Sequence, residues 1–362
     1  MVTFIAVTFF FIILRFVVTL FNFISDPKLR RVSKHYLDLV SILIPARNEE
    51  KNILRLLQSI RDQDYQNYEV IILDDDSVDK TYQLCSAFAN EQSNFRVIKG
   101  DNLPRNWLGK NYACHQLAAQ AKGNFLLFVD ADEEMHPGLI NSAVHRMYAN
   151  KLSLLSLFAN QQMNTLSEMM VVPLMHYILL NLLPLRLVYL VKNYTVAAAS
   201  GQFMLFDADS YRKHQWHQQV KHKIVEDVEI MRLVKSAGNK GEALLANGMI
   251  SCRMYSSYRE AVDGFSKNFL AAFNYNIIWF LIYIVFIIGG PMIILMTLNF
   301  AFVFFMVGLI VLTRVMISLA AGQNAWYNII LHPAQMFSLA LVAFLAIQRH
   351  LTKTITWKGR KI

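Results

Sequence analysis

Long apolar regions at both ends of the chain limit its fold more than any other feature. Residues 2–24 carry one charged side chain, Arg15, and residues 268–348 carry one, Arg314. A helix of about 20 apolar residues crosses the roughly 30 Å hydrocarbon core of a bilayer. We therefore expect an N-terminal transmembrane anchor over residues 1–26 and a C-terminal transmembrane region of two to three spans over residues 268–348.

Positive charges follow the first apolar run: Lys28, Arg30, Arg31 and Lys34. In a signal peptide the positive charges precede the apolar run and a small-residue cleavage site follows it, so we expect a retained anchor instead. By the positive-inside rule the next segment lies on the cytoplasmic side of the cell membrane.

The C-terminal region contains three apolar segments, residues 269–289, 291–312 and 329–347, with a turn expected at residues 289–291. Three spans would place the basic tail, residues 349–362, on the outer side, against the charge rule. Either the last segment is re-entrant or the tail is an exception.

Composition supports a membrane protein. Of the 362 residues 55% are hydrophobic and 17% charged, which excludes a disordered chain and argues against an ordinary soluble enzyme. A net charge of +9 suits an anionic lipid surface or a nucleic acid, and the hydropathy favours lipid, so we expect no nucleic acid partner. No obligate protein partner is evident. Three scattered cysteines indicate reduced thiols rather than disulfides.

The middle of the chain, residues 37–260, has the pattern of a globular domain. Short apolar runs at 39–44, 68–74, 95–98 and 124–132 read as buried strands. They alternate with helical stretches at 48–60, 79–89, 111–121 and 138–150. This alternation predicts an α/β fold, a doubly wound, mostly parallel sheet with helices on both faces.

An apolar insertion over residues 169–191 interrupts this domain. It contains Pro173, His176, Pro184 and Arg186, so one straight span is not expected. We predict an interfacial or re-entrant helix pair, while a true span or a buried core helix stay open. The arginines within apolar runs are functional candidates by default, although snorkelling explains them equally well.

Two polar loops follow the first two strands, at the sheet edge where open α/β folds bind ligands. The first is Pro45 to Glu50, which has neither a dinucleotide nor a P-loop pattern; a helix N-cap at Asn48 is its alternative. The second, Asp74 to Thr81, crowds carboxylates that repel one another unless cations or donors face them.

Two further motifs point to phosphate and metal chemistry. Trp107-Leu-Gly-Lys110 enters a helix, which places a lysine beside free N–H groups suited to phosphate oxygens. Asp130-Ala-Asp132 ends the fourth strand, where residues i and i+2 of an extended segment face the same way. Carboxylate oxygens are the ligands that Mg²⁺ and Mn²⁺ prefer, and an acidic turn is the alternative.

PARNE, DDDS-x-D-x-T, W-x-G-K and DAD occur in this order over residues 45–132, and the set resembles the family-2 glycosyltransferases with the GT-A fold. The resemblance covers roughly residues 39–255. It implies an inverting transferase that uses a nucleotide-sugar donor, usually a UDP-sugar, with Mn²⁺ or Mg²⁺ as cofactor. The residues implied to bind the donor are Pro45, Ala46, Arg47, Glu49, Asp75, Lys110 and Asp130, and Asp132 is implied to bind the metal.

The resemblance also implies a catalytic base. In the family it is the aspartate of a later Glu-Asp pair, here Glu226-Asp227, so Asp227 would take the proton of the acceptor hydroxyl. A helix cap is the alternative for this pair. The residues implied on the acceptor side are Gly201, Gln202, Glu226, Arg253 and Tyr255.

Within the family, the anchor, the Arg253-Met-Tyr255 element and Trp357 to Arg360 resemble bacterial carotenoid glycosyltransferases of the diaponeurosporenoate type. We therefore expect transfer of a single sugar to a membrane lipid such as a carotenoid or another hydroxylated or carboxylated lipid. A polyprenyl-phosphate, sphingoid or hopanoid transferase is an alternative. A processive polysaccharide synthase is a further alternative, but the sequence lacks the Q-x-x-R-W motif that such synthases carry. His214, His217 and His222 have no zinc-finger spacing, so a hydrogen-bonding or interfacial role is expected.

Overall fold

A computed structural model describes residues 2–273, 275–352, 356–357 and 360–361. Much of the predicted basic tail, with the Trp357 to Arg360 motif, therefore lies outside the residues whose side chains are described. The chain divides into two compact units. We call them the sheet unit (Pro27–Asn160 and Leu185–Arg253) and the helical unit (Met1–Asp26, Gln161–Pro184 and Met254–Ile362).

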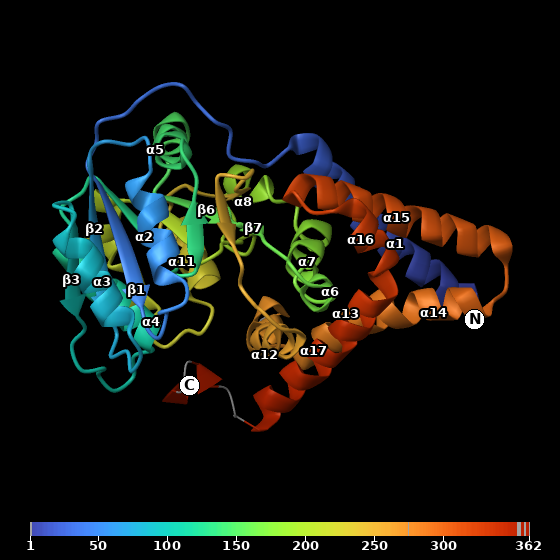
Figure 1. Ribbon diagram of the computed structural model, residues 1–362. Coiled ribbons are helices and arrows are strands. Elements are labelled where there is room, and N and C mark those ends of the chain that lie inside the picture. Colours follow the sequence, from blue (N-terminus) through green and yellow to red (C-terminus); the bar gives the residue numbers. More distant parts are fainter. Residues whose placement is uncertain (1, 274, 353–355, 358–359, 362) are drawn as a thin grey trace. The chain divides into compact units, whose positions relative to one another are not determined.

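The sheet unit is built on a seven-stranded sheet with the order β3-β2-β1-β4-β8-β6-β9 (Figure 1). Its strands are β1 (Val40–Ala46), β2 (Tyr68–Asp74), β3 (Phe95–Lys99), β4 (Phe125–Val129), β6 (Leu154–Phe158), β8 (Phe203–Asp207) and β9 (Gly241–Leu245). Strands β1 to β4 are parallel, and β8 runs antiparallel to both β4 and β6. The predicted mostly parallel α/β sheet is thus confirmed, with one antiparallel strand.

Burial on both faces explains why these strands read as unbroken apolar runs. All five residues of β4 and of β6 are buried. The first helices are α2 (Ile53–Arg61), α3 (Thr81–Asn90), α4 (Gly109–Gln120) and α5 (Leu139–Asn150). Helix α2 buries Ile53, Leu56, Leu57 and Ile60, the spacing of one helical face.

The later helices of the sheet unit are α8 (Leu187–Leu190), α9 (Ala208–His214), α10 (Trp216–Gln219) and α11 (Glu226–Ser236). Two short strands, β5 (Glu133–Met135) and β10 (Ile250–Cys252), pair antiparallel. This pairing brings residue 252 beside the segment that follows β4, and β7 (Asn160–Gln161) belongs to the same small sheet.

Two local predictions are wrong. Asn48 is not a helix N-cap: its φ is 53°, and α2 begins four residues after Glu49, at Ile53. The fourth strand ends at Val129, not at Asp132, and the Glu133 N–H reaches the Asp130 carbonyl at 3.3 Å to close a turn. Asp130 and Asp132 therefore do not project from one extended segment.

The helical unit contains the long apolar helices together with several shorter ones. They are α1 (Val2–Ser25), α6 (Leu166–Met169), α7 (Leu174–Leu182), α12 (Tyr258–Asn268), η1 (Phe269–Phe273), α13 (Ile277–Ile284), η2 (Val285–Gly289), α14 (Gly290–Met296), α15 (Phe300–Ala321), α16 (Ala325–Ile330) and α17 (His332–Thr352). A two-stranded pair, β11 (Thr356–Trp357) and β12 (Arg360–Lys361), follows them.

Four helices in the described part of the chain are long and apolar enough to cross a membrane. They are Val2–Ser25, Ile277–Met296, Phe300–Ala321 and His332–Thr352. The turn predicted at residues 289–291 is wrong, because α13 continues through the π-helical turn η2 into α14. Pro291 lies in the first turn of α14, where its missing N–H costs little. The chain instead turns just before Asn299, whose side chain caps α15.

The apolar insertion forms short helices rather than one span. Helix α7 ends at Leu182 and α8 begins at Leu187, so the break falls around Pro184. The boundary between the two units also falls there. On α1, the Asn22 amide donates to the Leu180 and Leu183 carbonyls at 2.8 Å each, which satisfies the end of α7. An interfacial position for this segment stays a prediction.

Candidate active site

Lys110 joins two of the predicted motifs. Its Nζ lies 2.7 Å from Oδ1 of Asp130, after β4, and 3.1 Å from Oε1 of Glu226, at the start of α11. Burial alone would lower the pKa of Lys110, but these two carboxylates outweigh it and raise that pKa well above its usual value. The lysine is therefore a permanent cation at the carboxyl edge of the sheet.

Asp227 is held beside this cation. Its Oδ2 accepts from the Gly201 N–H at 2.9 Å, and its Oδ1 accepts from the Val228 N–H at 2.7 Å. Burial, and then the charge of Glu226, raise the pKa of Asp227 to about 7. A carboxyl group with such a pKa can accept a proton near neutral pH.

Gly201 is required by close approach. A Cβ at this position would lie 2.9 Å from Nζ of Lys110 and 3.3 Å from Oε1 of Glu226. Because residue 201 has no side chain, its N–H reaches Asp227 while Lys110 keeps both ion pairs.

Hydrogen bonds made by two buried serines position Gln202. The Ser200 hydroxyl donates to the Gln202 side-chain oxygen at 3.1 Å, and the Ser156 hydroxyl accepts from the Ser200 N–H at 2.7 Å. The Gln202 carbonyl accepts from the Asp130 N–H at 3.4 Å. The predicted acceptor-side residues Gly201 and Gln202 therefore lie directly next to the Lys110 cluster.

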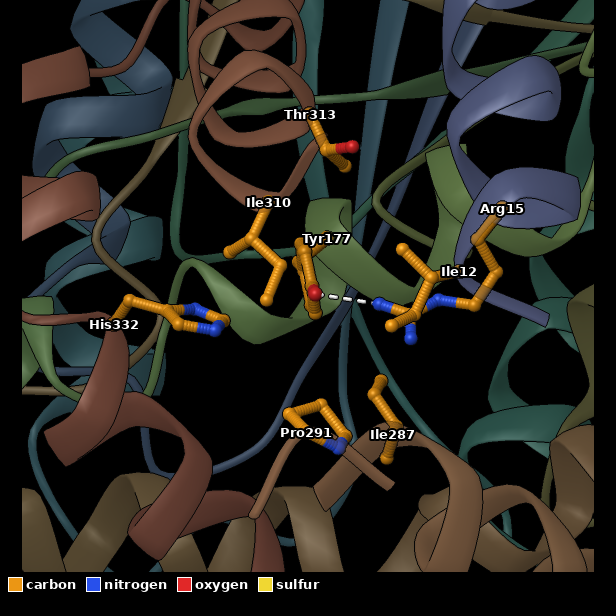
Figure 2. A pocket seen from close by; sticks show the side chains of 8 residues that line it. All are labelled: Ile12, Arg15, Tyr177, Ile287, Pro291, Ile310, Thr313 and His332. Carbon is orange, nitrogen blue, oxygen red and sulfur yellow. Dashed lines mark hydrogen bonds between the residues drawn. The ribbon is translucent and has the colours of Figure 1, made fainter. Parts of the chain in front are cut away.

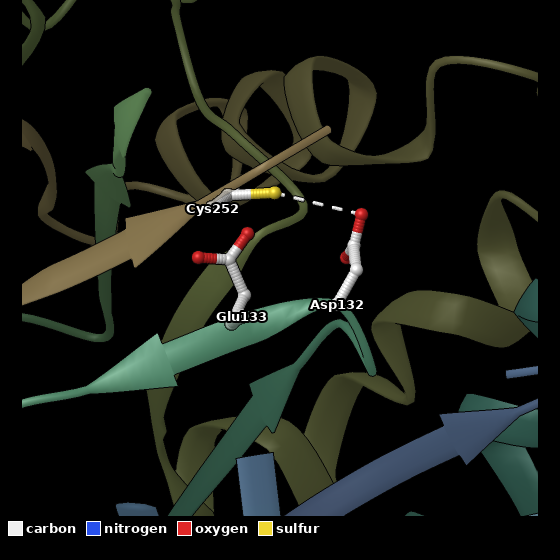
Figure 3. Close-up of side chains that lie close together, drawn as sticks. All are labelled: Asp132, Glu133 and Cys252. Atoms are coloured by element: carbon white, nitrogen blue, oxygen red, sulfur yellow. Dashed lines mark hydrogen bonds between the residues drawn. The ribbon is translucent and has the colours of Figure 1, made fainter. Parts of the chain in front are cut away.

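Asp132 faces a different set of partners. Its Oδ2 accepts from the Cys252 thiol at 3.5 Å, and ligand atoms of Asp132, Glu133 and Cys252 lie within 4.8 Å of one another. Figure 3 shows the sulfur and the two carboxylates gathered together. Burial, followed by the charges of Asp130 and Glu49, raises the pKa of Asp132 to about 6. The repulsion between these carboxylates is relieved when a cation binds beside them.

The two polar loops after β1 and β2 are tied to each other. Arg47 donates to the Asp75 and Asp76 carbonyls and lies 3.5 Å from the Asp76 carboxylate. The Glu49 N–H donates to the Thr81 hydroxyl at 2.7 Å, and the Asp75 N–H donates to the Ala46 carbonyl at 2.8 Å. The loops that carry Arg47, Glu49 and Asp75 are therefore held together, and Pro45 lies inside β1.

The Asp79 carboxylate anchors the second loop. Although burial acts in the opposite direction, hydrogen bonds from Thr81 and from the Glu50 backbone lower the pKa of Asp79. The Asp79 carboxylate is therefore held within the loop by hydrogen-bond donors. Such donors offset the repulsion expected among the neighbouring carboxylates of this segment.

The remaining predicted acceptor-side residues, Arg253 and Tyr255, belong to different units of the chain. Arg253 directly follows β10 and thus comes next to Cys252 in the sheet unit. Tyr255 belongs to the helical unit, where its ring contacts Phe265 and packs closely on Gly264.

Sequence reasoning missed Glu133 and Cys252. Glu133 follows the predicted metal residue directly and is fully buried, and burial together with the Asp132 and Asp130 charges raises its pKa well above the usual value. Cys252 adjoins Arg253, which is the one signal that could have drawn attention to it.

Two residues of the histidine cluster make side-chain contacts, and the predicted hydrogen-bonding role is confirmed for His217. The His217 ring is buried, hydrogen-bonds the Tyr211 hydroxyl at 2.6 Å and packs on Phe128. The His214 ring stacks on Trp216. Among the described residues, the one group with three neighbouring metal-binding side chains is Asp132, Glu133 and Cys252.

A family model described as "Glycosyl transferase family 2" matches residues 41–215. These residues are similar to the family-2 glycosyltransferase domain. The match includes both polar loops, Lys110, Asp130, Asp132 and Gly201, whereas Asp227 and Cys252 follow beyond it.

Curated relatives agree with the family-2 domain. A 4,4'-diaponeurosporenoate glycosyltransferase of Staphylococcus haemolyticus (strain JCSC1435) is 26% identical over 235 residues, 63% of this chain and 60% of that protein. The protein of the same name from Staphylococcus aureus (strain USA300) is 39% identical over 93 residues, 26% of this chain and 24% of that protein. The resemblance to this type of glycosyltransferase is confirmed, over no more than three fifths of the relatives' length.

A solved structure of similar fold is the mannosyltransferase PcManGT from Pyrobaculum calidifontis, in complex with GDP-Man and Mn²⁺. Its TM-score is 0.55 at 14% identity, covering 96% of this chain and 99% of that chain. This likeness supports the glycosyltransferase fold for the family-2 domain.

Proposed function

We propose that this protein transfers a single sugar from a nucleotide-sugar, a UDP-sugar in the first place, to a membrane lipid, with inversion at the anomeric carbon. The observation that carries the proposal is the cluster at Lys110. There, residues from four separate segments meet: Lys110 itself, Asp130, Gly201 and the Glu226-Asp227 pair. Motifs that are individually weak thereby form one site.

In the proposed reaction, Asp227 accepts the proton of the attacking acceptor O–H. The acceptor oxygen forms a bond to the anomeric carbon while the bond from that carbon to the diphosphate oxygen breaks. The nucleoside diphosphate leaves with the electron pair. A single displacement of this kind inverts the configuration, and the positive charge of Lys110 lies beside the base to stabilise the developing negative charge.

The two tied loops are proposed to bind the nucleoside. Arg47, Glu49 and Asp75 present polar groups at the edge of the sheet, and Ala46 leaves room beside them. PcManGT holds GDP-Man, also a nucleoside-diphosphate sugar, which supports this class of donor.

A divalent cation fits the residues at Asp132. The Asp132 carboxylate, raised in pKa and next to the carboxylate of Glu133, offers the oxygen ligands that Mn²⁺ or Mg²⁺ prefers, whereas the Cys252 thiol is too soft a ligand to add to them. Bound there, the cation would supply positive charge opposite the diphosphate. The Mn²⁺ of PcManGT supports this assignment.

The lipid acceptor and the location are proposed from the helices and the relatives. Four candidate spans indicate membrane association, and diaponeurosporenoate glycosyltransferases are named for a lipid acceptor. We propose a multi-pass protein of the cell membrane with a cytoplasmic catalytic domain over residues 37–260. The anchor, residues 1–26, and the C-terminal region, residues 268–348, would flank it.

The test uses the full chain in membranes with radiolabelled UDP-glucose, UDP-GlcNAc and GDP-mannose in separate reactions. We expect one donor to yield a lipid with one sugar, of configuration opposite to the donor by NMR. Asp227→Asn should abolish the product, whereas Asp209→Asn, at a fully exposed side chain, should not. A long polymer, a retained configuration or full activity of Asp227→Asn would contradict the proposal.

A further inference from the structure

Two arginines lie within the apolar helices of the helical unit. Arg15 comes from the middle of α1 and Arg314 from α15. Only 1% of the Arg314 surface is exposed, and Arg15 is half-buried. A guanidinium among apolar helices is costly unless something compensates its charge, so each position needs an explanation.

The two guanidinium groups meet at one tyrosine on α7. Arg15 donates to the Tyr177 hydroxyl at 2.5 Å, and the Arg314 guanidinium lies 3.6 Å from the centroid of the Tyr177 ring. Arg314 also donates through Nε to Nδ1 of His332 at 2.9 Å. Figure 2 shows Arg15 and His332 approaching Tyr177 from opposite sides.

No acidic side chain in the described part of the chain pairs with these charges. The sequences of α1, α7 and α13 to α17 contain neither aspartate nor glutamate. Among the described residues, neither Arg15 nor Arg314 takes part in an ion pair with a carboxylate. Two positive charges therefore lie close together without a protein anion.

Both arginines keep an unused donor. Nε of Arg15 and Nη2 of Arg314 are buried and make no hydrogen bond within the described part of the chain, and the same holds for the hydroxyl of Tyr283 on α13. Buried donors without acceptors are destabilising, and an anionic oxygen group satisfies several of them at once.

The same place also contains aliphatic side chains. A small hollow is lined by Arg15, Tyr177, Thr313 and His332 together with Ile12, Ile287, Pro291 and Ile310 (Figure 2). Charged donors next to aliphatic side chains match a molecule that has an acidic group on a hydrocarbon chain.

We infer that Arg15 and Arg314 bind the anionic group, a carboxylate or a phosphate, of a membrane lipid. The lipid group supplies the negative charge that the helices lack. This inference does not depend on the proposed sugar transfer, because it rests on the helical unit alone.

The experiment measures lipid binding by the full chain in a neutral detergent, without any sugar donor. The probes are tritiated oleic acid and dioleoyl phosphatidic acid, with oleyl alcohol and dioleoylglycerol as neutral analogues and inorganic phosphate as a soluble anion. We expect at least one acidic lipid to bind about tenfold or more tightly than its neutral analogue. Arg15→Gln and Arg314→Gln should each lose about tenfold in affinity.

Arg349→Gln is the matched control, because Arg349 belongs to the same unit but pairs with Asp263 at 2.7 Å. It should bind the acidic lipid within twofold of the unaltered chain. Tyr283→Phe, which keeps the ring, should weaken binding several-fold and serves if an arginine variant does not fold. Without lipid, Arg314→Gln should melt at the same or a higher temperature, since an uncompensated buried charge is removed.

Equal binding of acidic and neutral lipids would overturn the inference, as would unchanged affinity in both arginine variants. Inorganic phosphate that binds as tightly as phosphatidic acid would overturn the assignment to a lipid. A melting temperature that falls in Arg314→Gln while lipid affinity stays the same would show a structural role instead. Sugar transfer can fail with the binding result intact, so the two proposals are tested separately.

Discussion

At the scale of single residues, the carboxylate of Asp227 has an environment unlike that of an ordinary helix cap. Two backbone N–H groups fix its oxygens, and Lys110 and Glu226 set its charge state. The alternative of a simple cap accounts for the Val228 contact but not for the Gly201 contact from a distant loop.

Activity should depend on the protonation of Asp227. The base must be deprotonated, and its pKa is raised to about 7, so kcat/KM should rise with pH through about 7 and level off above it. Asp227→Asn should lower kcat by about 100-fold or more at every pH. A pH profile of initial rates checks this, and a profile that falls as pH rises from 6 to 8 would contradict it.

Lys110 should tune this profile. Its positive charge lowers the pKa of Asp227, so Lys110→Gln should move the acidic limb of the profile to higher pH. Lys110→Arg keeps the charge and should leave the limb near its original position. Profiles of both variants that coincide with that of the unaltered chain would show that the ion pairs are only structural.

Asp132 should make activity dependent on metal. Chelation with EDTA should abolish turnover, and Mn²⁺ or Mg²⁺ should restore it, because the departing diphosphate needs its charge neutralised. Asp132→Ala should stay inactive at all metal concentrations tested. Full activity in EDTA would contradict a metal site at Asp132.

At the scale of elements, one glycine lets two strands start side by side. A Cβ at Gly123 would lie 2.7 Å from the Leu39 carbonyl and the Ser41 N–H nitrogen, which are backbone atoms and cannot turn aside. The Gly123 N–H donates to the Ser41 hydroxyl at 2.8 Å, and Ser41 in turn donates to Glu69 at 2.6 Å. These bonds fix the register of β1, β2 and β4, and with it the edge that carries the site.

Gly123→Ala should therefore lower the free energy of unfolding by about 1–3 kcal/mol through overpacking. The thermal melting temperature in detergent measures this change. Lys122→Ala is its control, since that side chain is exposed and only its backbone N–H bonds to Glu69. Equal melting temperatures of the glycine variant and the unaltered chain would contradict this prediction, because β1 and β4 would then make room for the methyl group without loss of stability.

At the scale of the whole molecule, the net charge of +9 and the four apolar helices predict a protein whose sheet unit lies at a membrane surface. The charge rule applied to the residues after α1 predicts that this unit lies on the cytoplasmic side. The three cysteines are buried, so we do not expect the unaltered chain to react with a thiol-labelling reagent.

Val78 lies on the loop after β2 and is 84% exposed. In Val78→Cys, a membrane-impermeant maleimide should label inside-out vesicles and leave intact cells unlabelled. The unaltered chain, treated in the same way, should remain unlabelled in both. Labelling of the variant in intact cells would place the sheet unit on the outer side.

Several features of this protein follow from local sequence. The runs at residues 70–73 and 125–129 are apolar throughout, so burial on both faces and strand formation are predictable. The long helices follow from apolar length alone, and the order of the motifs over residues 45–132 carries the resemblance to the family. Such signals depend on neighbours within one element.

Tertiary structure decided what lies beside what. Asp130 turns to Lys110 and Asp132 to Cys252 because the chain bends after Val129, although the sequence is compatible with a longer strand. Cys252 reaches Asp132 only through the pairing of β10 with β5. Arg15 and Arg314 meet at one tyrosine although almost 300 residues separate them. Contacts of this kind depend on how distant elements pack, and no local pattern of residues encodes that packing.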